Sequence, residues 1–365
     1  MQITRENLET ILKQIKQSHP ECYVLMSPNS IGELLYTCGL AKSFRTQHQA
    51  PIVLCVRPEH VQLVETLYPN RFKAIVPLHM EVMRAFITLG VVPYGYFGKD
   101  YPIVLSPLHY ENGRIAQLKN LLIVRAGNSG LSSTDAWRYM LHLDWDAKLE
   151  QPNMEWVYEF GEKFTAAGIN LDNFALLQLG NNTNKPLPSQ FYSALEKKLA
   201  ETGTQILANA TGSMLVPQNL NLVHSVNVQA DALSALALMK FASVTVTGNN
   251  GLALFEWATK KLDGRESETH VITSNMYCKH YNLLRTDWEN AFEPWDNNMS
   301  LWHCIPELIV EPNNFYEWFG DCNLSGEEYE EFAVNMVDKD LSSKHYIQPP
   351  EEIHFPRMAE FDKNF

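Results

Sequence analysis

The sequence lacks the features that mark several large classes of protein. No apolar run approaches the ~20 residues that a transmembrane helix needs, so we expect no transmembrane segment. Residues 1–17, MQITRENLETILKQIKQ, carry charges throughout and have no apolar core, which is unlike a secretory signal peptide. Basic side chains number 29 against 42 acidic ones, and the net charge of −13 argues against a nucleic-acid-binding protein.

Motifs for metal and phosphate chemistry are also absent. The 12 histidines form no HExxH motif and no His/Cys pair at zinc spacing. The D-x-D triplet DWD at 144–146 lies in a polar segment rather than after a predicted strand. Neither a GxxxxGK(S/T) phosphate loop nor a GxSxG nucleophile elbow occurs. We therefore expect no metal site and no cofactor.

The cysteines form no CxxC pair. Three of them, Cys22, Cys38 and Cys55, lie among apolar residues. Buried free thiols in a reducing compartment account for this pattern, which favours a cytoplasmic protein. A lipid-linked substrate would add peripheral contact with the inner face of the membrane, although no basic amphipathic helix indicates it.

The sequence does contain a regular alternation of strand and helix patterns. In the first half, apolar runs at 24–26, 51–56 and 72–76 alternate with helical patterns at 33–44 and 60–67. Strands that alternate with helices in this way predict parallel βαβ units and a doubly wound α/β sheet.

The alternation restarts after a polar segment at 143–153 and fades after residue 263. A length of 365 residues favours two domains over one. We therefore predict two similar α/β domains that face a cleft, and a C-terminal tail that packs back on them. The predicted boundaries are 1–148, 149–335 and 336–365.

The stretch SPNSIGELLYTCGL, residues 27–40, leads from the first predicted strand into the helical pattern that follows it. Asn29 and Ser30 are residue types that cap helix starts, and Gly32 permits a close approach of the backbone. Glu33 falls in the first helical turn, where the helix dipole favours a negative charge. Glu33 is therefore either a helix-capping charge or a catalytic base, and the local pattern does not choose between them.

Two polar loops follow predicted strands in the second half. GNNTNKPLP at 180–188 contains a lysine that can neutralise a phosphate. TGNNG at 247–251 opens a helix, whose free N–H groups suit a diphosphate. Each loop alone also fits a solvated loop or a tight turn. Because ligands bind outside the carboxyl ends of such strands, the candidate anion-binding residues are Gly180, Asn181, Asn182, Thr183, Lys185, Gly248, Asn249, Asn250 and Gly251.

In their order and spacing these segments resemble glycosyltransferase family 9, the ADP-heptose:lipopolysaccharide heptosyltransferases, which have the GT-B fold. The resemblance covers residues 22–260, and its main segments are the opening stretch, PIVLCVRPEHVQLVE, YPIVLSPLHYENGRIAQL, FALLQLGNNTNKPLPSQFYSALEKKLAETG and DALSALALMKFASVTVTGNNG. The last loop departs from the family pattern, since Asn249 stands in place of an Asp, Leu252 of a Pro and Leu254 of a His.

The resemblance implies an inverting, metal-independent glycosyltransferase with two Rossmann-like domains. The loss of the regular pattern after residue 263 adds an irregular C-terminal extension, which does not resemble the family. Its substrates would be a nucleotide-sugar donor and a glycan or lipid-linked acceptor, in the synthesis of surface polysaccharide or lipopolysaccharide. Glu33 matches the family's catalytic base, an Asp, and Lys185 matches its phosphate-contacting Lys. The two polar loops would bind the donor. The residues implied on the acceptor side are Asn29, Ser30, Gly32, His109 and Arg114.

The departures at Asn249 and Leu254 keep two alternatives open. One is a non-catalytic protein that uses the GT-B fold to bind a nucleotide sugar, a glycan or a partner protein. The other is a nucleotide-sugar epimerase. Nucleotide binding without turnover would favour the first alternative, and turnover of a nucleotide sugar without any acceptor would favour the second.

Overall fold

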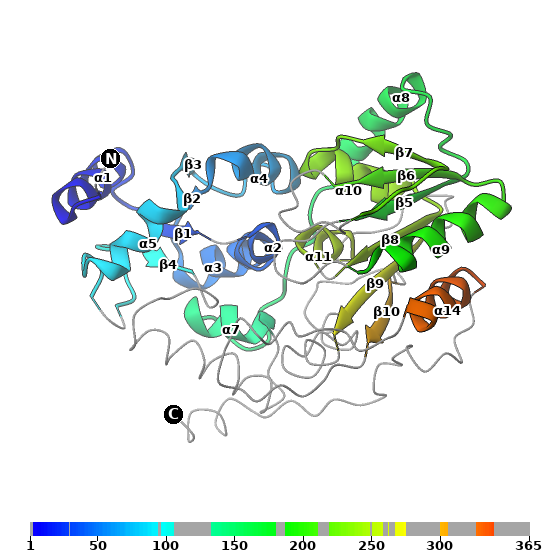
Figure 1. Ribbon diagram of the computed structural model, residues 1–365. Helices are drawn as coiled ribbons and strands as arrows, with labels where there is room; N and C mark the ends of the chain where they lie inside the picture. Colours follow the sequence, from blue (N-terminus) through cyan, green and yellow to red (C-terminus); the bar gives the residue numbers. More distant parts are fainter. Residues whose placement is uncertain are drawn as a thin grey trace. The chain divides into compact units, whose positions relative to one another are not determined.

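The computed structural model describes residues 3–28, 30–93, 96–105, 133–179, 187–210, 219–248, 250–257, 262, 267–274, 300–305 and 326–338. The described chain divides into two compact units, of which the first ends at Asn153 and the second begins at Met154. Each unit is built around a parallel β-sheet (Figure 1).

The described strands of the first unit form a four-stranded sheet in the order β3-β2-β1-β4. They are β1 (Tyr23–Ser27), β2 (Ile52–Val56), β3 (Ala74–Pro77) and β4 (Ile103–Val104). All neighbouring pairs are parallel. The strand β2, IVLCV, is apolar and buried at every position, as expected for a parallel strand that is covered on both faces.

Helices cover both faces of this sheet. They are α1 (Arg5–Ser18), α2 (Ile31–Gly39), α3 (Ala41–His48), α4 (Val61–Leu67), α5 (Met80–Thr88) and α7 (Ser133–Met140). α1 and α5 pack on the face that presents Met26 and Cys55. α3 packs on the opposite face, where Phe44 meets Tyr23 edge to face with ring centroids 5.1 Å apart. The predicted thiols Cys22, Cys38 and Cys55 are confirmed as free and buried.

The described strands of the second unit form a six-stranded sheet in the order β10-β9-β8-β5-β6-β7. They are β5 (Phe174–Gln178), β6 (Gln205–Asn209), β7 (Ser225–Val228), β8 (Val244–Gly248), β9 (Glu268–Ser274) and β10 (Ser300–Ile305). All neighbouring pairs are again parallel. Two of these strands lie after residue 263, where the sequence pattern had faded.

The helices of the second unit are α8 (Tyr158–Ala166), α9 (Ser189–Glu201), α10 (Ala232–Phe241), α11 (Gly251–Trp257) and α14 (Gly326–Val337). α9 and α14 share a core with one face of the sheet, and Phe191 and Phe332 lie 5.5 Å apart in it. Phe164 of α8 contacts Phe241 of α10. No described helix has both the length and the apolar character that crossing a membrane requires.

Numbered within each unit, the strands run 3-2-1-4 in the first sheet and 3-2-1-4-5-6 in the second. This is the strand order of the doubly wound Rossmann fold. The prediction of an α/β protein with two Rossmann-like units is therefore confirmed.

Candidate functional site

The strand order of each sheet reverses at one point, between β1 and β4 in the first unit and between β5 and β8 in the second. Ligands of doubly wound sheets bind at this switch point, outside the carboxyl ends of the strands. β5 and β8 are in register to their ends, with Gln178 opposite Thr247. β5 and β8, after which the two predicted polar loops follow in the sequence, therefore end side by side at the switch point of their sheet.

Glu33 lies in the first turn of α2, which begins shortly after β1 ends at Ser27. Its side chain is only 5% exposed, and Gly32 beside it is buried. Glu33 Oε2 accepts hydrogen bonds from the backbone N–H of Ser30 at 2.7 Å and from the Ser30 hydroxyl at 3.2 Å. A first-turn carboxylate that binds back to the N-cap N–H belongs to a capping box. The box holds this carboxylate in one orientation at the switch point of the first sheet.

The helix that carries Glu33 is itself fixed by α7. The indole Nε1 of Trp137 donates to the Thr37 hydroxyl at 3.1 Å, and that hydroxyl donates to the carbonyl oxygen of Glu33 at 3.2 Å. The Trp137 ring also stacks on Tyr36, with ring centroids 4.8 Å apart. These contacts give the carboxylate the rigid support that a positioned functional group requires.

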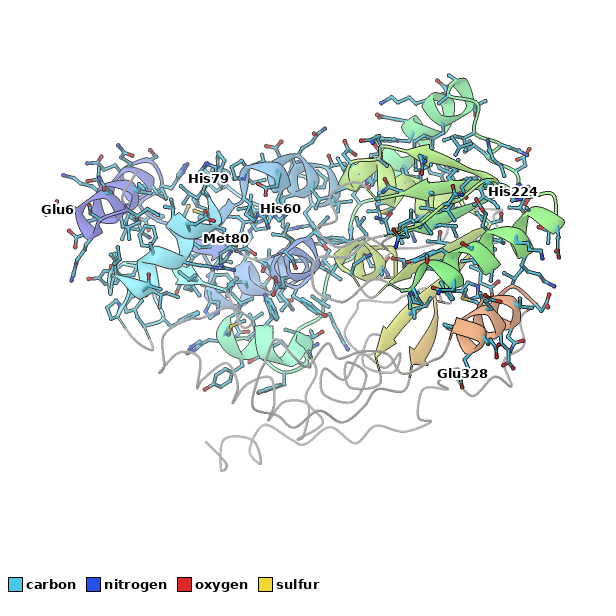
Figure 2. The ribbon with its side chains drawn as sticks, in the orientation of Figure 1. Glu6, His60, His79, Met80, His224 and Glu328 are labelled. Atoms are coloured by element: carbon cyan, nitrogen blue, oxygen red, sulfur yellow. The ribbon has the colours of Figure 1, made fainter. Side chains whose placement is uncertain are left out.

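A buried histidine follows the neighbouring strand, β2. His60 closes the short 3-10 helix Pro58–His60 at the start of α4 and is 8% exposed (Figure 2). Burial lowers the pKa of His60 to about 4, and the nearby Arg57 guanidinium contributes in the same direction. The imidazole is therefore neutral at pH 7.

The carboxyl edge of the second sheet carries a row of buried polar side chains. Asn209 of β6 lies opposite Gln178 of β5, which lies opposite Thr247 of β8. Asn209 Nδ2 donates to Gln178 Oε1 at 2.9 Å, and Asn209 Oδ1 accepts from the backbone N–H of Ala230 at 3.3 Å. Asn209 thus links the ends of β5 and β6 to the segment that enters α10.

Asn250 continues this row into the second polar loop. Its Nδ2 donates to Thr247 Oγ1 at 2.9 Å, and its Oδ1 accepts from the backbone N–H of Ala253 at 3.0 Å. Asn250 therefore caps α11, which begins at Gly251, directly after β8 has ended at Gly248. This side chain shapes the loop, and one N–H group of the helix start is already bonded.

The described residues include only part of the predicted site. Those at the two switch points are Ser30, Gly32, Glu33, Gly248, Asn250 and Gly251. Those that lie outside the described residues are Asn29, His109, Arg114, Gly180, Asn181, Asn182, Thr183, Lys185 and Asn249. The functional roles of both sets stay predictions.

Sequence reasoning missed Gln178 and Asn209. The signal was present, because each is the polar last residue of a strand, FALLQ and QILAN, that is buried there, and a buried amide needs hydrogen-bond partners. Among the described residues, no group of three or more His, Cys, Asp or Glu side chains is arranged to hold a metal ion.

Two solved glycosyltransferases share the fold of this chain. A glycosyl transferase of family 9 from Veillonella parvula DSM 2008 matches with a TM-score of 0.53 and 10% identity, over 88% of this chain and 98% of that one. The ADP-heptose lipopolysaccharide heptosyltransferase II of E. coli matches with a TM-score of 0.50 and 11% identity, over 88% of this chain and 100% of that one. No protein-family model matches the sequence, and the comparison with curated proteins found no match.

Identities near 10% establish a common fold and nothing finer. The predicted fold class, the two Rossmann-like units of GT-B, is confirmed by these matches together with the two parallel sheets. The predicted resemblance to family 9 likewise holds at the level of the fold.

Proposed function

We propose that the protein is a glycosyltransferase of the GT-B fold that transfers a sugar from a nucleotide-sugar donor to a hydroxyl group of a glycan or lipid-linked glycan. We propose further that the reaction inverts the configuration at the anomeric carbon and uses no metal. The product would serve the synthesis of surface polysaccharide or lipopolysaccharide. The observation that carries the proposal is the buried carboxylate of Glu33 at the switch point of the first sheet. The fold shared with two glycosyltransferases over most of the chain supports it.

In this mechanism Glu33 accepts the proton of the acceptor hydroxyl, from a distance of about 3 Å. The acceptor oxygen then attacks the anomeric carbon, and the bond between that carbon and the diphosphate breaks. Lys185 and the backbone N–H groups of its loop stabilise the departing nucleoside diphosphate, as positioned donors do for developing charge. The second loop assists from the neighbouring strand, since β5 and β8 end side by side.

The test is Glu33→Gln. A glutamine also forms a capping box, with its side-chain oxygen on the N-cap N–H, so the helix start keeps its hydrogen bond from Ser30. The melting temperature should then stay within about 2 °C of wild type. Loss of the base should lower kcat at least about 100-fold. Transfer rates on a donor and acceptor panel and thermal unfolding check the two expectations.

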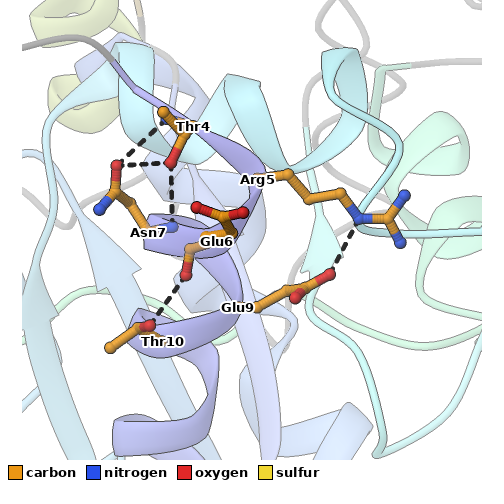
Figure 3. A network of polar contacts seen from close by, with 6 residues as sticks. All are labelled: Thr4, Arg5, Glu6, Asn7, Glu9 and Thr10. Atoms are coloured by element: carbon orange, nitrogen blue, oxygen red, sulfur yellow. Dashed lines mark hydrogen bonds and ion pairs between the residues drawn. The ribbon is translucent and has the colours of Figure 1, made fainter.

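The helix α1 supplies the matched control. Its capping box joins Thr4 and Asn7, with the backbone N–H of Thr4 donating to Asn7 Oδ1 at 3.3 Å (Figure 3), so a side-chain amide suffices there. Glu6 is the acid in the first turn of α1, and Glu6→Gln should leave kcat unchanged. If Glu33→Gln retains wild-type activity within threefold, Glu33 is a capping residue and not the base.

The capping box itself favours a second function. Oε2 of Glu33 is already engaged by two donors of Ser30, so helix capping alone accounts for an acid at this position. We keep a non-catalytic nucleotide-sugar or glycan-binding protein as the alternative. Saturable binding of a nucleotide sugar, with neither transfer nor hydrolysis across a broad donor panel, would establish that alternative.

A further inference from the structure

Two buried polar atoms at the carboxyl edge of the first sheet have no hydrogen-bond partner within the described part of the chain. They are Ser27 Oγ and His60 Nδ1. Ser27 is the last residue of β1 and is 0% exposed, and His60 is 8% exposed. An unpaired buried polar atom destabilises a folded protein, so each of these atoms calls for a physical explanation.

The fold brings the two residues to the same edge and the same face of the sheet. Ser27 pairs with Val56, the last residue of β2, and the 3-10 helix that ends in His60 follows directly. Ser27 and Tyr23 are four residues apart on β1, so their side chains lie on the same face of the sheet. α3 packs on that face. Because βαβ crossovers are right-handed, α2 and α4 cover this face as well. Glu33 in the first turn of α2 and His60 directly before α4 therefore both lie at the edge where β1 and β2 end.

The chemistry of the pair suits a neutral, hydroxylated ligand. A serine hydroxyl both donates and accepts, and the nitrogen of a neutral imidazole does one or the other according to its tautomer. A sugar hydroxyl likewise donates and accepts. An anion would need cations or several N–H donors, but the Arg57 guanidinium beside His60 is bonded to Glu59, with Nε and Oε1 2.8 Å apart.

We propose that Ser27 and His60 form a hydrogen-bonding subsite for the hydroxyl groups of a neutral sugar, next to Glu33. The inference rests on the proposed function and adds two binding residues, together with the class of acceptor that they select. The sugar supplies the partners that both atoms lack in the free protein. Binding requires the edge to open, because both atoms are buried.

A matched pair of variants separates this role from simple burial. Thr245 on β8 of the second unit has an equally buried hydroxyl without a partner, but it lies toward the start of its strand, away from the carboxyl edge. Ser27→Ala and Thr245→Val each remove one unpaired hydroxyl. Both variants should unfold at the wild-type temperature or above, and only Ser27→Ala should weaken sugar binding.

The experiment titrates the full chain with methyl glycosides of neutral hexoses and heptoses at millimolar concentration. The corresponding hexuronic acids serve as the anionic comparison. The readout is the NMR signal of the His60 ring in protein labelled at histidine Cε1, identified by its absence in His60→Phe. We expect a neutral glycoside to shift this signal saturably, with a Kd about tenfold higher in Ser27→Ala and unchanged in Thr245→Val.

The proposal is overturned if no neutral glycoside moves the His60 signal, if Ser27→Ala binds as wild type does, or if the uronic acids bind in preference. Failure of the proposed function has a different signature. In that case no nucleoside diphosphate stabilises the protein, and the wild-type protein transfers no sugar across the donor and acceptor panel. Neither of those measurements depends on Ser27 or His60.

Discussion

At the scale of single residues, the position of Glu33 fits both a helix cap and the catalytic base proposed above. Its carboxylate completes the cap of α2, and the same hydrogen bonds orient it at the switch point. The sequence placed an acid after the first strand, and the two readings of that acid, cap and base, are physically compatible.

A residue-scale prediction concerns pH. His60 has a pKa near 4 when folded, against 6.5 as its ordinary value, so the unfolded chain binds the proton first as the pH falls. The stabilisation from neutral His60 is complete above pH 6.5 and is lost between pH 6.5 and 4, by about 3 kcal/mol at the lower limit. Urea unfolding across this range should show a flatter pH dependence for His60→Phe than for wild type.

The control for this measurement is His79→Gln, at an exposed histidine of the same unit (Figure 2). The free energy of unfolding of this variant should depend on pH as that of wild type does, because His60 and all carboxyl groups are unchanged in it. Parallel curves for wild type and His60→Phe would mean that burial does not hold His60 neutral.

At the scale of elements, the polar segment at 143–153 behaves differently from a free linker. Leu149 is fully buried, and a β-carbon on Gly39 of α2 would come within 2.9 Å of its Cδ2. Glu150 forms an ion pair with Arg71, and the backbone N–H of Asn153 donates to the carbonyl of Leu67 at 2.7 Å. The sequence of segment 143–153 did not predict this packing, because an ion pair and backbone hydrogen bonds produce no hydrophobic pattern along the chain.

The edge strand β7 provides an element-scale prediction. Its start is held by Glu196 of α9, whose carboxylate accepts from the backbone N–H groups of Val223 and His224 and, at 2.6 Å, from the Ser225 hydroxyl. Glu196→Ala should lower the free energy of unfolding by about 2–4 kcal/mol, because several charge-assisted hydrogen bonds are lost at a buried site. Urea unfolding measures this change.

The matched control is Glu201→Ala, at an exposed glutamate that ends the same helix, and it should cost less than about 0.5 kcal/mol. Amide hydrogen exchange adds a local readout. In Glu196→Ala, exchange should accelerate in β7 more than in β5. Equal stabilities for the two variants would show that Glu196 does not anchor the strand.

At the scale of the whole molecule, each unit has its own sheet and its own buried core. Scanning calorimetry should therefore resolve two unfolding transitions. A nucleoside diphosphate at about 100 times its Kd stabilises the folded state that binds it by about 2.7 kcal/mol. We expect it to raise only the transition of the second unit, by about 5–10 °C.

Lysine variants identify the loop that is responsible. Lys185→Ala should reduce this shift, whereas Lys197→Ala, at an exposed position of α9, should preserve it. If the nucleotide instead raised the unfolding temperature of the first unit, it would bind there, and the proposed donor site in the second unit would be contradicted. The domain boundary at 148 also stays a prediction.

The sequence by itself determined the α/β class, the repetition of the fold in two halves and the acid after the first strand. Apolar runs, helical spacing and turn residues are local, and so they can be read along the chain. Only the tertiary structure decided the strand order, which makes β5 and β8 neighbours, and the pairing of Asn209 with Gln178. It also decided that Ser27 and His60 share one edge, because these relations join residues that are distant in sequence, and no local pattern records them.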